Sequence, residues 1–303
     1  MRVLLVVAVI VIIAVAAVRQ PTLPSSYVAH SHASAARLQR DVITFTSIAR
    51  CADDPSSLDR AATYIEQQFR ATGAQVVVQT YTARRHNYRN VIASFGPGDG
   101  ELTIVGAHYD AFCEPHALPG ADDNASGVAG LLELARLLAR ERVIHPIALV
   151  AYSTEEPPFF GTDEMGSAIH AQSLGRRPAR ALILEMIGCF TSDSNLPGLF
   201  KWIYPRRGDF VVVAGRWSDV MLTREIKRGM SAATRVVSFT GPAFDASDQR
   251  NYWLANREAV MITDTAYLRN PRYHTARDTA DTLDYSRMGR VVDGVLNALL
   301  LAH

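Results

Sequence analysis

Short apolar runs alternate with segments of helical periodicity along most of this chain. Leu102–Gly106, Pro146–Ser153 and Arg180–Met186 have the length and composition of buried strands. After the first of these runs, apolar residues recur at helical spacing between Val128 and Leu138. Further strands are predicted at 74–81, 88–94, 210–215 and 259–263, and further helices at 38–49, 56–72, 165–172, 218–234 and 285–301. This alternation predicts a layered α/β domain around a largely parallel sheet, with the early pair of strands forming an antiparallel edge.

The N-terminus departs from this pattern. Residues 3–18 form an uninterrupted apolar run between Arg2 and Arg19. This run is shorter than the roughly 20 residues that span a bilayer comfortably. We therefore interpret residues 1–19 as a signal peptide, with an N-terminal membrane anchor through residues 3–18 as the alternative. Both interpretations predict an extracytoplasmic protein, secreted or anchored to the membrane. Residues 20–35 have the composition of a linker, and residues 36–303 are expected to form one domain.

Composition narrows the choice of partners. The formal net charge is +1 and charged residues make up 20% of the chain, which gives no electrostatic signature of nucleic-acid binding. The three cysteines, Cys51, Cys113 and Cys189, show no CxxC spacing. An exported chain permits one disulfide, for which we expect Cys113 and Cys189 because each follows a predicted strand. Buried free thiols are the alternative.

Acidic residues and histidines follow the ends of successive predicted strands. Because the carboxyl ends of parallel strands meet at one edge of a sheet, these side chains are expected to lie together. Unpaired acids at such close range would raise one another's pKa, and a divalent cation resolves that repulsion. The sequence therefore predicts a metal site, and its candidate residues are His108, Asp110, Asp122, Glu155, Glu156, Glu185 and His274.

The residue types indicate which metal and what chemistry. Imidazole and carboxylate ligands without thiolate pairs are typical of catalytic zinc or a similar first-row ion. The set is large enough for two ions, with Asp122 between them and one histidine and one acid on either side. His108 and Asp110 are two residues apart, so in an extended segment Asp110 can accept the second ring N–H of His108. Pro157 keeps Glu156 extended, so one glutamate can bind metal while Glu155 faces water as a general base.

These motifs, in this order, resemble those of the co-catalytic zinc aminopeptidase superfamily, which includes glutamate carboxypeptidases and glutaminyl cyclases. The motifs are His108-Tyr-Asp110, Gly120-Ala-Asp-Asp-Asn-Ala-Ser-Gly127, Glu155-Glu156, Glu185-Met-Ile-Gly188 and Tyr273-His274-Thr-Ala-Arg-Asp278-Thr. The resemblance covers the chain from about Leu38 onward. It implies a three-layer fold, a mixed and mostly parallel sheet with helices on both faces.

The resemblance also implies a role for each residue. One zinc ion would be held by His108, Asp122 and Glu185, and the other by Asp122, Glu156 and His274. Glu155 would be the general base for a metal-bridging hydroxide, and Asp110 would orient His108. Two departures stand out, because the position of Glu185 is more often aspartate in this superfamily and Gln249 stands where relatives often have histidine.

The leading hypothesis is therefore an exported metallo-aminopeptidase that uses two Zn²⁺ ions to act on peptide substrates. A glutaminyl cyclase with one zinc ion, an acyltransferase on the same scaffold, is an alternative, but it needs fewer ligands than this chain retains. A binding domain without catalysis is a third class, in which we would expect ligands or the base to be missing. The aromatic residues Phe200, Trp202 and Tyr204 lie in a long irregular segment, where they pack on the core or wall a substrate pocket.

Overall fold

The computed structural model describes residues 2–114, 116–242 and 245–301, and strands of this part of the chain form one eight-stranded sheet. The helices are α1 (Arg2–Arg19), α2 (Ala35–Thr46), α3 (Pro55–Arg70), α4 (Gly127–Leu138), α5 (Gly166–Ser173), α6 (Phe200–Ile203), α7 (Val220–Met230), α8 (Gln249–Leu254) and α9 (Tyr285–Leu301). The strands are β1 (Gln75–Ala83), β2 (His86–Phe95), β3 (Leu102–His108), β4 (Ile147–Tyr152), β5 (Ala179–Glu185), β6 (Val211–Arg216), β7 (Val236–Gly241) and β8 (Glu258–Thr263).

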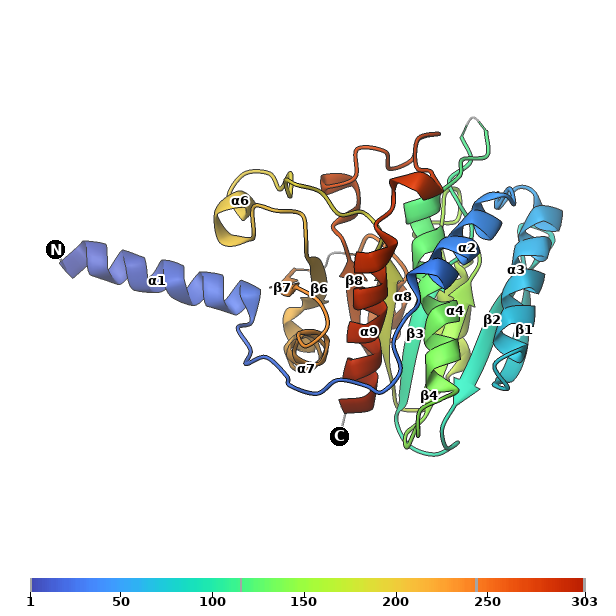
Figure 1. Ribbon diagram of the computed structural model, residues 1–303, viewed down its shortest axis with the longest axis horizontal. Helices are drawn as coiled ribbons and strands as arrows, with labels where there is room; N and C mark the ends of the chain where they lie inside the picture. The colour runs from blue at the N-terminus through green and yellow to red at the C-terminus, as the bar shows by residue number, and fades with distance from the viewer. Residues whose placement is uncertain (1, 115, 243–244, 302–303) are drawn as a thin grey trace.

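The sheet is mixed, and its centre is parallel (Figure 1). The strand order is β1-β2-β4-β3-β5-β8-β6-β7, and the four central strands β4, β3, β5 and β8 run parallel to one another. Strands β1 and β2 pair antiparallel, and β2 also runs antiparallel to β4. At the other edge, β6 is antiparallel to β8 and parallel to β7. The predicted mostly parallel sheet with an early antiparallel edge is confirmed.

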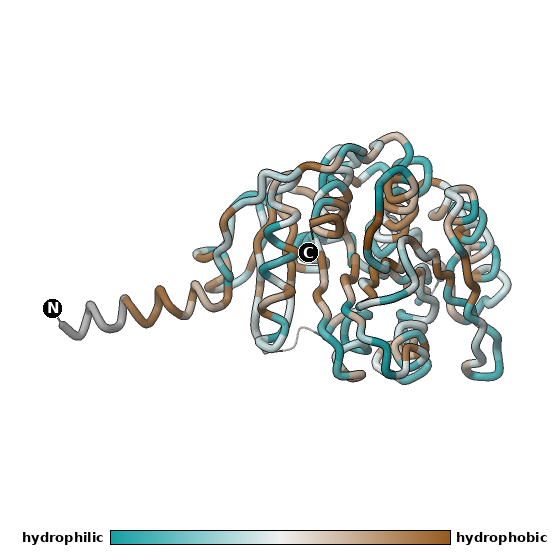
Figure 2. The backbone as a smooth tube through the Cα atoms, turned by 90° about the horizontal axis from the view of Figure 1, so that it is seen from below, coloured by the Kyte–Doolittle hydropathy of each residue, from teal (hydrophilic) through white to brown (hydrophobic). Residues whose placement is uncertain are grey.

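Helices cover both faces of this sheet. Side chains alternate along a strand, so Leu182 and Leu184 of β5 belong to one hydrophobic core while Ala181 and Ile183 belong to another. The first core lies under α2, α3, α4, α7 and α9, and the second lies under α5 and α8. Figure 2 shows hydrophobic backbone positions gathered between these layers. The three-layer α/β architecture is therefore confirmed.

Three elements were not anticipated from the hydrophobic pattern, and one of them is the four-residue helix α6 in the segment that was expected to be irregular. Strand β7 and helix α8 have six residues each, which is too short for either periodicity to stand out. The predicted helix 218–234 is also shorter than expected: α7 begins at Val220 after a 3₁₀ turn at Trp217–Asp219, and it ends at Met230. Helix α8 matters for the site, since the residues just before it reach the ends of the central strands.

The N-terminal helix α1 projects from the domain (Figures 1 and 2), and the segment after it follows the domain surface. Backbone N–H groups of this segment donate to side chains of α9 and α4, from Ala29 to Asn297 (2.8 Å) and from Ser34 to Glu133 (2.8 Å). A segment with the composition of a linker is thus attached to the domain at several points. Within the part of the chain that the structure describes, no helix reaches the length and hydropathy needed to cross a bilayer.

Candidate functional site

The predicted site residues meet at the carboxyl ends of the central parallel strands. His108 is the last residue of β3, and Glu185 is the last residue of β5. Glu155 and Glu156 follow β4, and His274 lies in the long loop after β8. Since β4, β3, β5 and β8 are neighbours in that order, one sheet edge brings all of these residues together. The carboxylates and His108 are buried, and His274 is partly exposed.

A kinked loop before α4 places Asp123 in the middle of this group. The loop turns at Gly120 (φ +51°), and Asp123 has non-helical dihedral angles (φ −101°, ψ 95°). The side chain of Asn124 ties the loop to the end of β5, because Nδ2 donates to Leu184 O (2.8 Å) and Oδ1 accepts from Met186 N (3.1 Å). The Asp123 carboxylate lies 3.4 Å from His108 Nε2 and 3.1 Å from His274 Nε2.

This geometry corrects the expectation for Asp122. The Asp122 carboxylate turns away from the histidines and accepts hydrogen bonds from Gly188 N (3.0 Å) and Asn270 Nδ2 (2.8 Å). The backbone N–H groups of Asp122 and Asp123 both donate to the carboxylate of Asp278, which fixes the loop. Adjacent side chains diverge from this anchored backbone. Asp123 therefore occupies the shared position between the histidines that the sequence analysis gave to Asp122.

Two groups of side chains share Asp123 and could each hold a metal ion. Ligand atoms of His108, Asp123 and Glu185 lie within 4.8 Å of one another, and so do those of Asp123, Glu156 and His274. Buried ligand atoms without hydrogen-bond partners indicate that these groups fit a cation. Nε2 of His108, Nε2 of His274 and Oε1 of Glu156 are buried and have no hydrogen-bond partner among the described residues. A divalent cation would satisfy these atoms at once, since imidazole nitrogen and carboxylate oxygen are ligands that zinc accepts.

Electrostatics also indicate that this site favours a cation. Burial and the neighbouring Asp123 raise the pKa of Glu156 to about 7. Burial opposes charge on His274, but the carboxylates of Asp123 and Glu156 beside its ring outweigh this effect and raise the His274 pKa to about 9. Burial together with the charges of Glu156 and Glu185 raises the Glu155 pKa well above its usual range. Without metal, protons must therefore offset the crowded carboxylates, and a bound cation would replace them.

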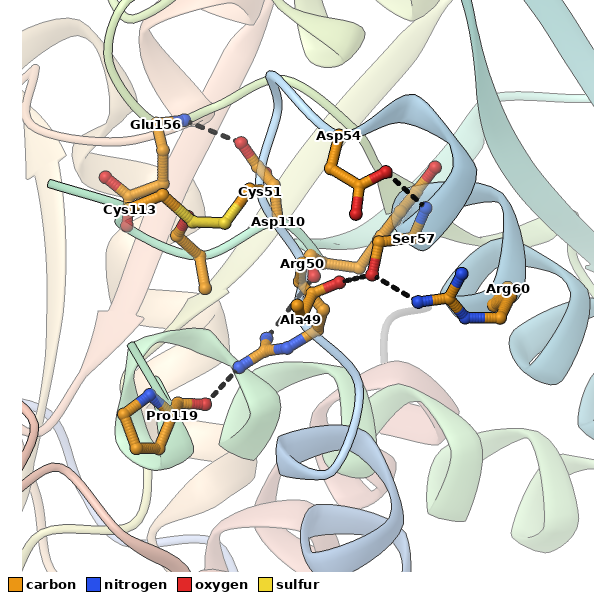
Figure 3. Close-up of a disulfide and its surroundings, with 12 residues drawn as sticks. Ala49, Arg50, Cys51, Asp54, Ser57, Arg60, Asp110, Cys113, Pro119 and Glu156 are labelled. Carbon is orange, nitrogen blue, oxygen red and sulfur yellow. Dashed lines mark hydrogen bonds between the residues drawn. A yellow bond between two sulfur atoms is a disulfide. The ribbon is translucent and has the colours of Figure 1, made fainter. Parts of the chain in front are cut away.

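Asp110 and Glu155 lie beside these groups without being shared between them. Asp110 Oδ1 is 3.4 Å from His108 Nδ1, the ring nitrogen opposite the one that faces Asp123. Its other oxygen accepts a hydrogen bond from the backbone N–H of Glu156 (2.9 Å), as Figure 3 shows. Glu155 Oε2 is 3.9 Å from His108 Nε2. Asp110 is thus placed to orient His108, and Glu155 lies within reach of a molecule bound between the ligand groups.

Two further contacts at the site were missed by the sequence analysis. The His274 ring is stacked between Tyr273 and Phe112, with ring centroids 3.8 and 4.0 Å away. Ser247 Oγ donates to Oε2 of Glu185 (2.5 Å) and so holds the end of this side chain. Ser247 lies two residues before Gln249, one of the two departures from the superfamily pattern. A single serine before a helix as short as α8 does not indicate a functional role in the sequence alone. Gln249 itself is fully buried.

An apolar cavity of about 120 Å³ adjoins the site next to Glu185 and Tyr273. One wall comes from the irregular segment before β6, and another comes from the loop after β8. Phe200 and Tyr204 line the cavity, while Trp202 is 70% exposed and does not. The lining is completed by Leu196, Val212, Ala214, Phe239, Ala246, Met261, Thr263, Thr265, Ala266, Tyr267 and Leu268. A site with buried polar groups on one side and this cavity on the other can orient a ligand that carries an apolar side chain.

The disulfide differs from the expected one. Cys51 and Cys113 are bonded, with Cα atoms 5.6 Å apart, and Cys189 is a buried free thiol. The expected Cys113–Cys189 bond is therefore wrong. That bond was expected because both cysteines follow predicted strands whose ends lie close together. Cys113, however, lies in the long loop after β3, and this loop folds back toward the segment between α2 and α3 (Figure 3).

Comparison with known proteins agrees with this geometry. The model of peptidase family M28 matches residues 90–299. The uncharacterized protein YfbL of Escherichia coli K12 is 47% identical over 88% of this chain and 88% of its own length. Leucine aminopeptidase 1 of Trichophyton rubrum is 30% identical over 90% of this chain and 78% of its own length.

Solved structures share the fold. A leucine aminopeptidase precursor from Bacteroides thetaiotaomicron superposes with a TM-score of 0.69 at 19% identity, covering 91% of this chain and 99% of that one. The glutaminyl cyclase of Porphyromonas gingivalis gives a TM-score of 0.70 at 19% identity, covering 90% and 100%. One architecture therefore accompanies two different activities in these neighbours, so the choice between activities has to rest on the site.

Proposed function

The chain belongs to peptidase family M28, and from that premise we propose that it is an exported aminopeptidase that removes N-terminal residues from peptides with two bound zinc ions. The observation that carries the proposal is the position of Asp123, whose two oxygens face one histidine each. A shared carboxylate with a separate histidine and a separate glutamate on either side is the ligand set of a paired metal site. The aminopeptidase from Trichophyton rubrum, at 30% identity, supports the peptidase assignment.

Each buried residue has a task in this reaction. Bound zinc would supply a Lewis acid that polarises the scissile carbonyl and lowers the pKa of water. Glu155 would accept the proton of the attacking water and pass it to the leaving amine, since its carboxylate faces the site without belonging to the two groups that share Asp123. Asp110 would keep the His108 ring in one tautomer through Nδ1. Burial of all three residues excludes bulk water from the proton transfer.

The apolar cavity supports a preference for substrates with an apolar N-terminal residue. Apart from Glu185, which the proposal assigns to the metal, the described residues that line the cavity carry no charged side chain that could pair with a lysyl or aspartyl substrate. Burying such a charge without a partner is costly, whereas an apolar side chain gains about 25 cal/mol per Å² that it removes from water. We therefore expect leucyl substrates to be cleaved with a higher kcat/KM than lysyl or aspartyl ones.

The proposal is tested on purified full-length protein by elemental analysis and by assays with leucyl, alanyl, lysyl and aspartyl p-nitroanilides. We expect close to two zinc ions per chain and the highest kcat/KM for the leucyl substrate. Ala214→Leu should fill the cavity and lower kcat/KM for the leucyl substrate more than for the alanyl one. Ala148→Leu is the matched control, because Ala148 is equally buried on β4 but does not line the cavity. Overpacking costs about 1–3 kcal/mol at either position, so only the change in preference is diagnostic.

A different result would favour the cyclase alternative. One zinc ion per chain, with cyclisation of an N-terminal glutaminyl peptide and no release of p-nitroaniline, would replace the aminopeptidase by a glutaminyl cyclase. No bound zinc in protein supplied with the metal would reject both enzymes. The retention of both histidines, Glu185 and Glu156 around Asp123 is why we place the aminopeptidase first.

Export is part of the proposal because of the N-terminal apolar run and the Cys51–Cys113 disulfide, a bond that persists in oxidising compartments. Differential thiol labelling in cell fractions tests it. Cys51 and Cys113 should react with a maleimide only after reduction, in the extracytoplasmic fraction, and reaction without reduction would contradict export. N-terminal sequencing of the mature protein then separates a cleaved signal peptide from a membrane anchor retained through residues 3–18.

A further inference from the structure

Arg50 is a fully buried arginine beside the loop that leads from β3 to Gly120, and Figure 3 shows its guanidinium facing Pro119 of this loop. It comes from the segment between α2 and α3, which precedes the part of the chain that matches peptidase family M28, residues 90–299. Its guanidinium donates to three backbone carbonyls, Tyr109 O (3.3 Å), Pro119 O (2.5 Å) and Gly120 O (2.9 Å). One buried side chain from outside the matched region thus binds both ends of the loop that connects β3 to the turn at Gly120.

The carbonyls that Arg50 binds belong to the backbone next to candidate metal ligands. Tyr109 stands between His108 and Asp110, so its carbonyl belongs to the backbone that presents both residues. Gly120 begins the kinked loop that presents Asp123. The rigid, planar guanidinium therefore sets the distance between the backbone that carries His108 and the backbone that carries Asp123.

Gly120 permits this close approach. A Cβ atom at that position would lie 2.9 Å from Arg50 Nη2 and 2.2 Å from Asp123 O. Gly120 also has a positive φ of 51°, which disfavours residues with a side chain. The loop is thus shaped to receive the guanidinium.

The residue next to Arg50 adds a covalent link to the same loop. Cys51 is bonded to Cys113, which lies between Tyr109 and Gly120 in sequence. The backbone carbonyl of Arg50 also accepts a hydrogen bond from Ala111 N (2.9 Å). The Arg50–Cys51 dipeptide therefore holds the loop at both ends and in the middle.

The charge of Arg50 suits its surroundings as well. Burial lowers the Arg50 pKa to about 10, while the carboxylates of Asp123, Asp110, Asp278 and Glu156 favour the charged form. The guanidinium therefore stays positively charged near these carboxylates, while its hydrogen bonds go to backbone carbonyls. A fixed positive charge would by itself weaken the binding of a metal cation, so any gain in metal affinity from Arg50 has to come from geometry.

We infer that Arg50 is a positioning residue that holds His108 and Asp123 at the spacing required for metal binding, and that the Cys51–Cys113 bond secures the same loop. The inference rests on the proposed function, because it assumes that these residues bind zinc. It predicts that an N-terminal segment outside the matched region determines metal affinity at a site built from the matched one.

Arg50→Lys tests this inference because it keeps the charge and removes the planar fork. A single ammonium group is a point donor, and it cannot reach Tyr109 O and Gly120 O with the geometry of the guanidinium. We expect the zinc affinity, measured by competition with a chromogenic chelator, to fall about 10–100-fold, as is typical when the partners of metal ligands are lost. The visible spectrum of the cobalt-substituted variant should change too, because the ligand geometry changes.

Arg269→Lys is the matched control. Arg269 is equally buried, donates to the backbone carbonyl of Phe210 (2.8 Å) and lies over a phenylalanine ring, as Arg50 lies over Phe45. Its hydrogen bonds to described residues go to Cys189 and Phe210, and none of them reaches the described part of the loop between Tyr109 and Gly120. Both variants should lower the free energy of unfolding of the metal-free protein, but only Arg50→Lys should weaken zinc binding.

Two results separate the possible failures. If the wild-type protein binds zinc and Arg50→Lys binds it equally well with an unchanged cobalt spectrum, the inference is overturned while the proposed function stands. If the wild-type protein binds no zinc, the proposed function fails first. Should Arg50→Lys not fold, the double variant Cys51→Ala, Cys113→Ala frees the same loop at its middle. We expect severalfold weaker zinc binding from that variant, and unchanged affinity would overturn the inference.

Discussion

The Asp123 carboxylate lies between the rings of His108 and His274. Its Oδ1 is 3.4 Å from His108 Nε2, and its Oδ2 is 3.1 Å from His274 Nε2. No other described carboxylate belongs to both groups of candidate ligands that contain a histidine and Asp123. Because β3 carries His108 and the loop after β8 carries His274, Asp123 connects opposite sides of the site. Its neighbour Asp122 serves the backbone of the surrounding loops instead.

This arrangement predicts that Asp123→Asn and Asp122→Asn have different consequences. Under the proposed function, Asp123→Asn removes a charged ligand from both candidate metal positions, so the zinc content should fall from about two ions to less than one per chain, with loss of activity. Asp122→Asn keeps a similar shape and leaves the ligand set intact, so zinc content should stay close to the wild-type value. Elemental analysis of both variants measures this. A larger loss of zinc in Asp122→Asn would return the shared position to Asp122.

The two adjacent glutamates should also separate by function. Glu155→Gln removes the expected base, so kcat should fall by about 10²–10⁴-fold while the zinc content is unchanged. Glu156→Gln is the matched comparison, because Glu156 belongs with His274 to a ligand group and its loss should lower zinc occupancy. Steady-state kinetics and elemental analysis on the same preparations distinguish the two effects. Near-normal turnover by Glu155→Gln would exclude Glu155 as the base.

Much of this molecule could be anticipated from its sequence because the pattern is strong where the fold is regular. Buried parallel strands such as β3 and β4 appear as continuous apolar runs, and the residues that follow them must gather at one sheet edge. His108, Glu185, Glu156 and His274 could therefore be placed together before any coordinates.

The parts that escaped prediction depend on contacts between distant residues. Which of Asp122 and Asp123 faces the histidines is decided by Asp278, which anchors the loop from more than 150 positions away. The partner of Cys113 depends on how its loop folds back onto Arg50, and the spacing of the cysteines in the sequence does not predict this fold. Short elements such as α8 add the same difficulty, since six residues show no clear period.

Ser247 should matter for metal affinity because Glu185 is longer by one methylene group than the aspartate that is more frequent in the superfamily this chain resembles. The Ser247 hydroxyl donates to Glu185 Oε2 (2.5 Å) and restrains this longer side chain. Ser247→Ala should weaken zinc binding about 10–100-fold, measured by chelator competition. Ser218→Ala is a suitable control, because its hydroxyl contacts Asp219 at a distance from the site. Equal affinity in Ser247→Ala and wild type would mean that packing alone holds Glu185.

The stability of the metal-free protein should fall as the pH rises from about 5 to 9. The pKa of Glu156 is about 7 in the folded state and 4.5 in the unfolded chain. The folded state therefore keeps a proton that the unfolded chain loses, and the stabilisation is lost as the pH rises from 4.5 through 7. His274, with a folded-state pKa of about 9 against 6.5, contributes stability that is complete below 6.5 and lost by 9.

Zinc should reverse this trend, because it displaces those protons and therefore binds more tightly at higher pH. Urea unfolding at pH 5, 7 and 9, with and without zinc, measures both effects. His274→Ala is the internal control, since it should make the decline between pH 6.5 and 9 smaller than in the wild type. If the metal-free protein instead gains stability across that interval, the histidine cannot be protonated between Asp123 and Glu156, and the electrostatic description of the site would have to be replaced.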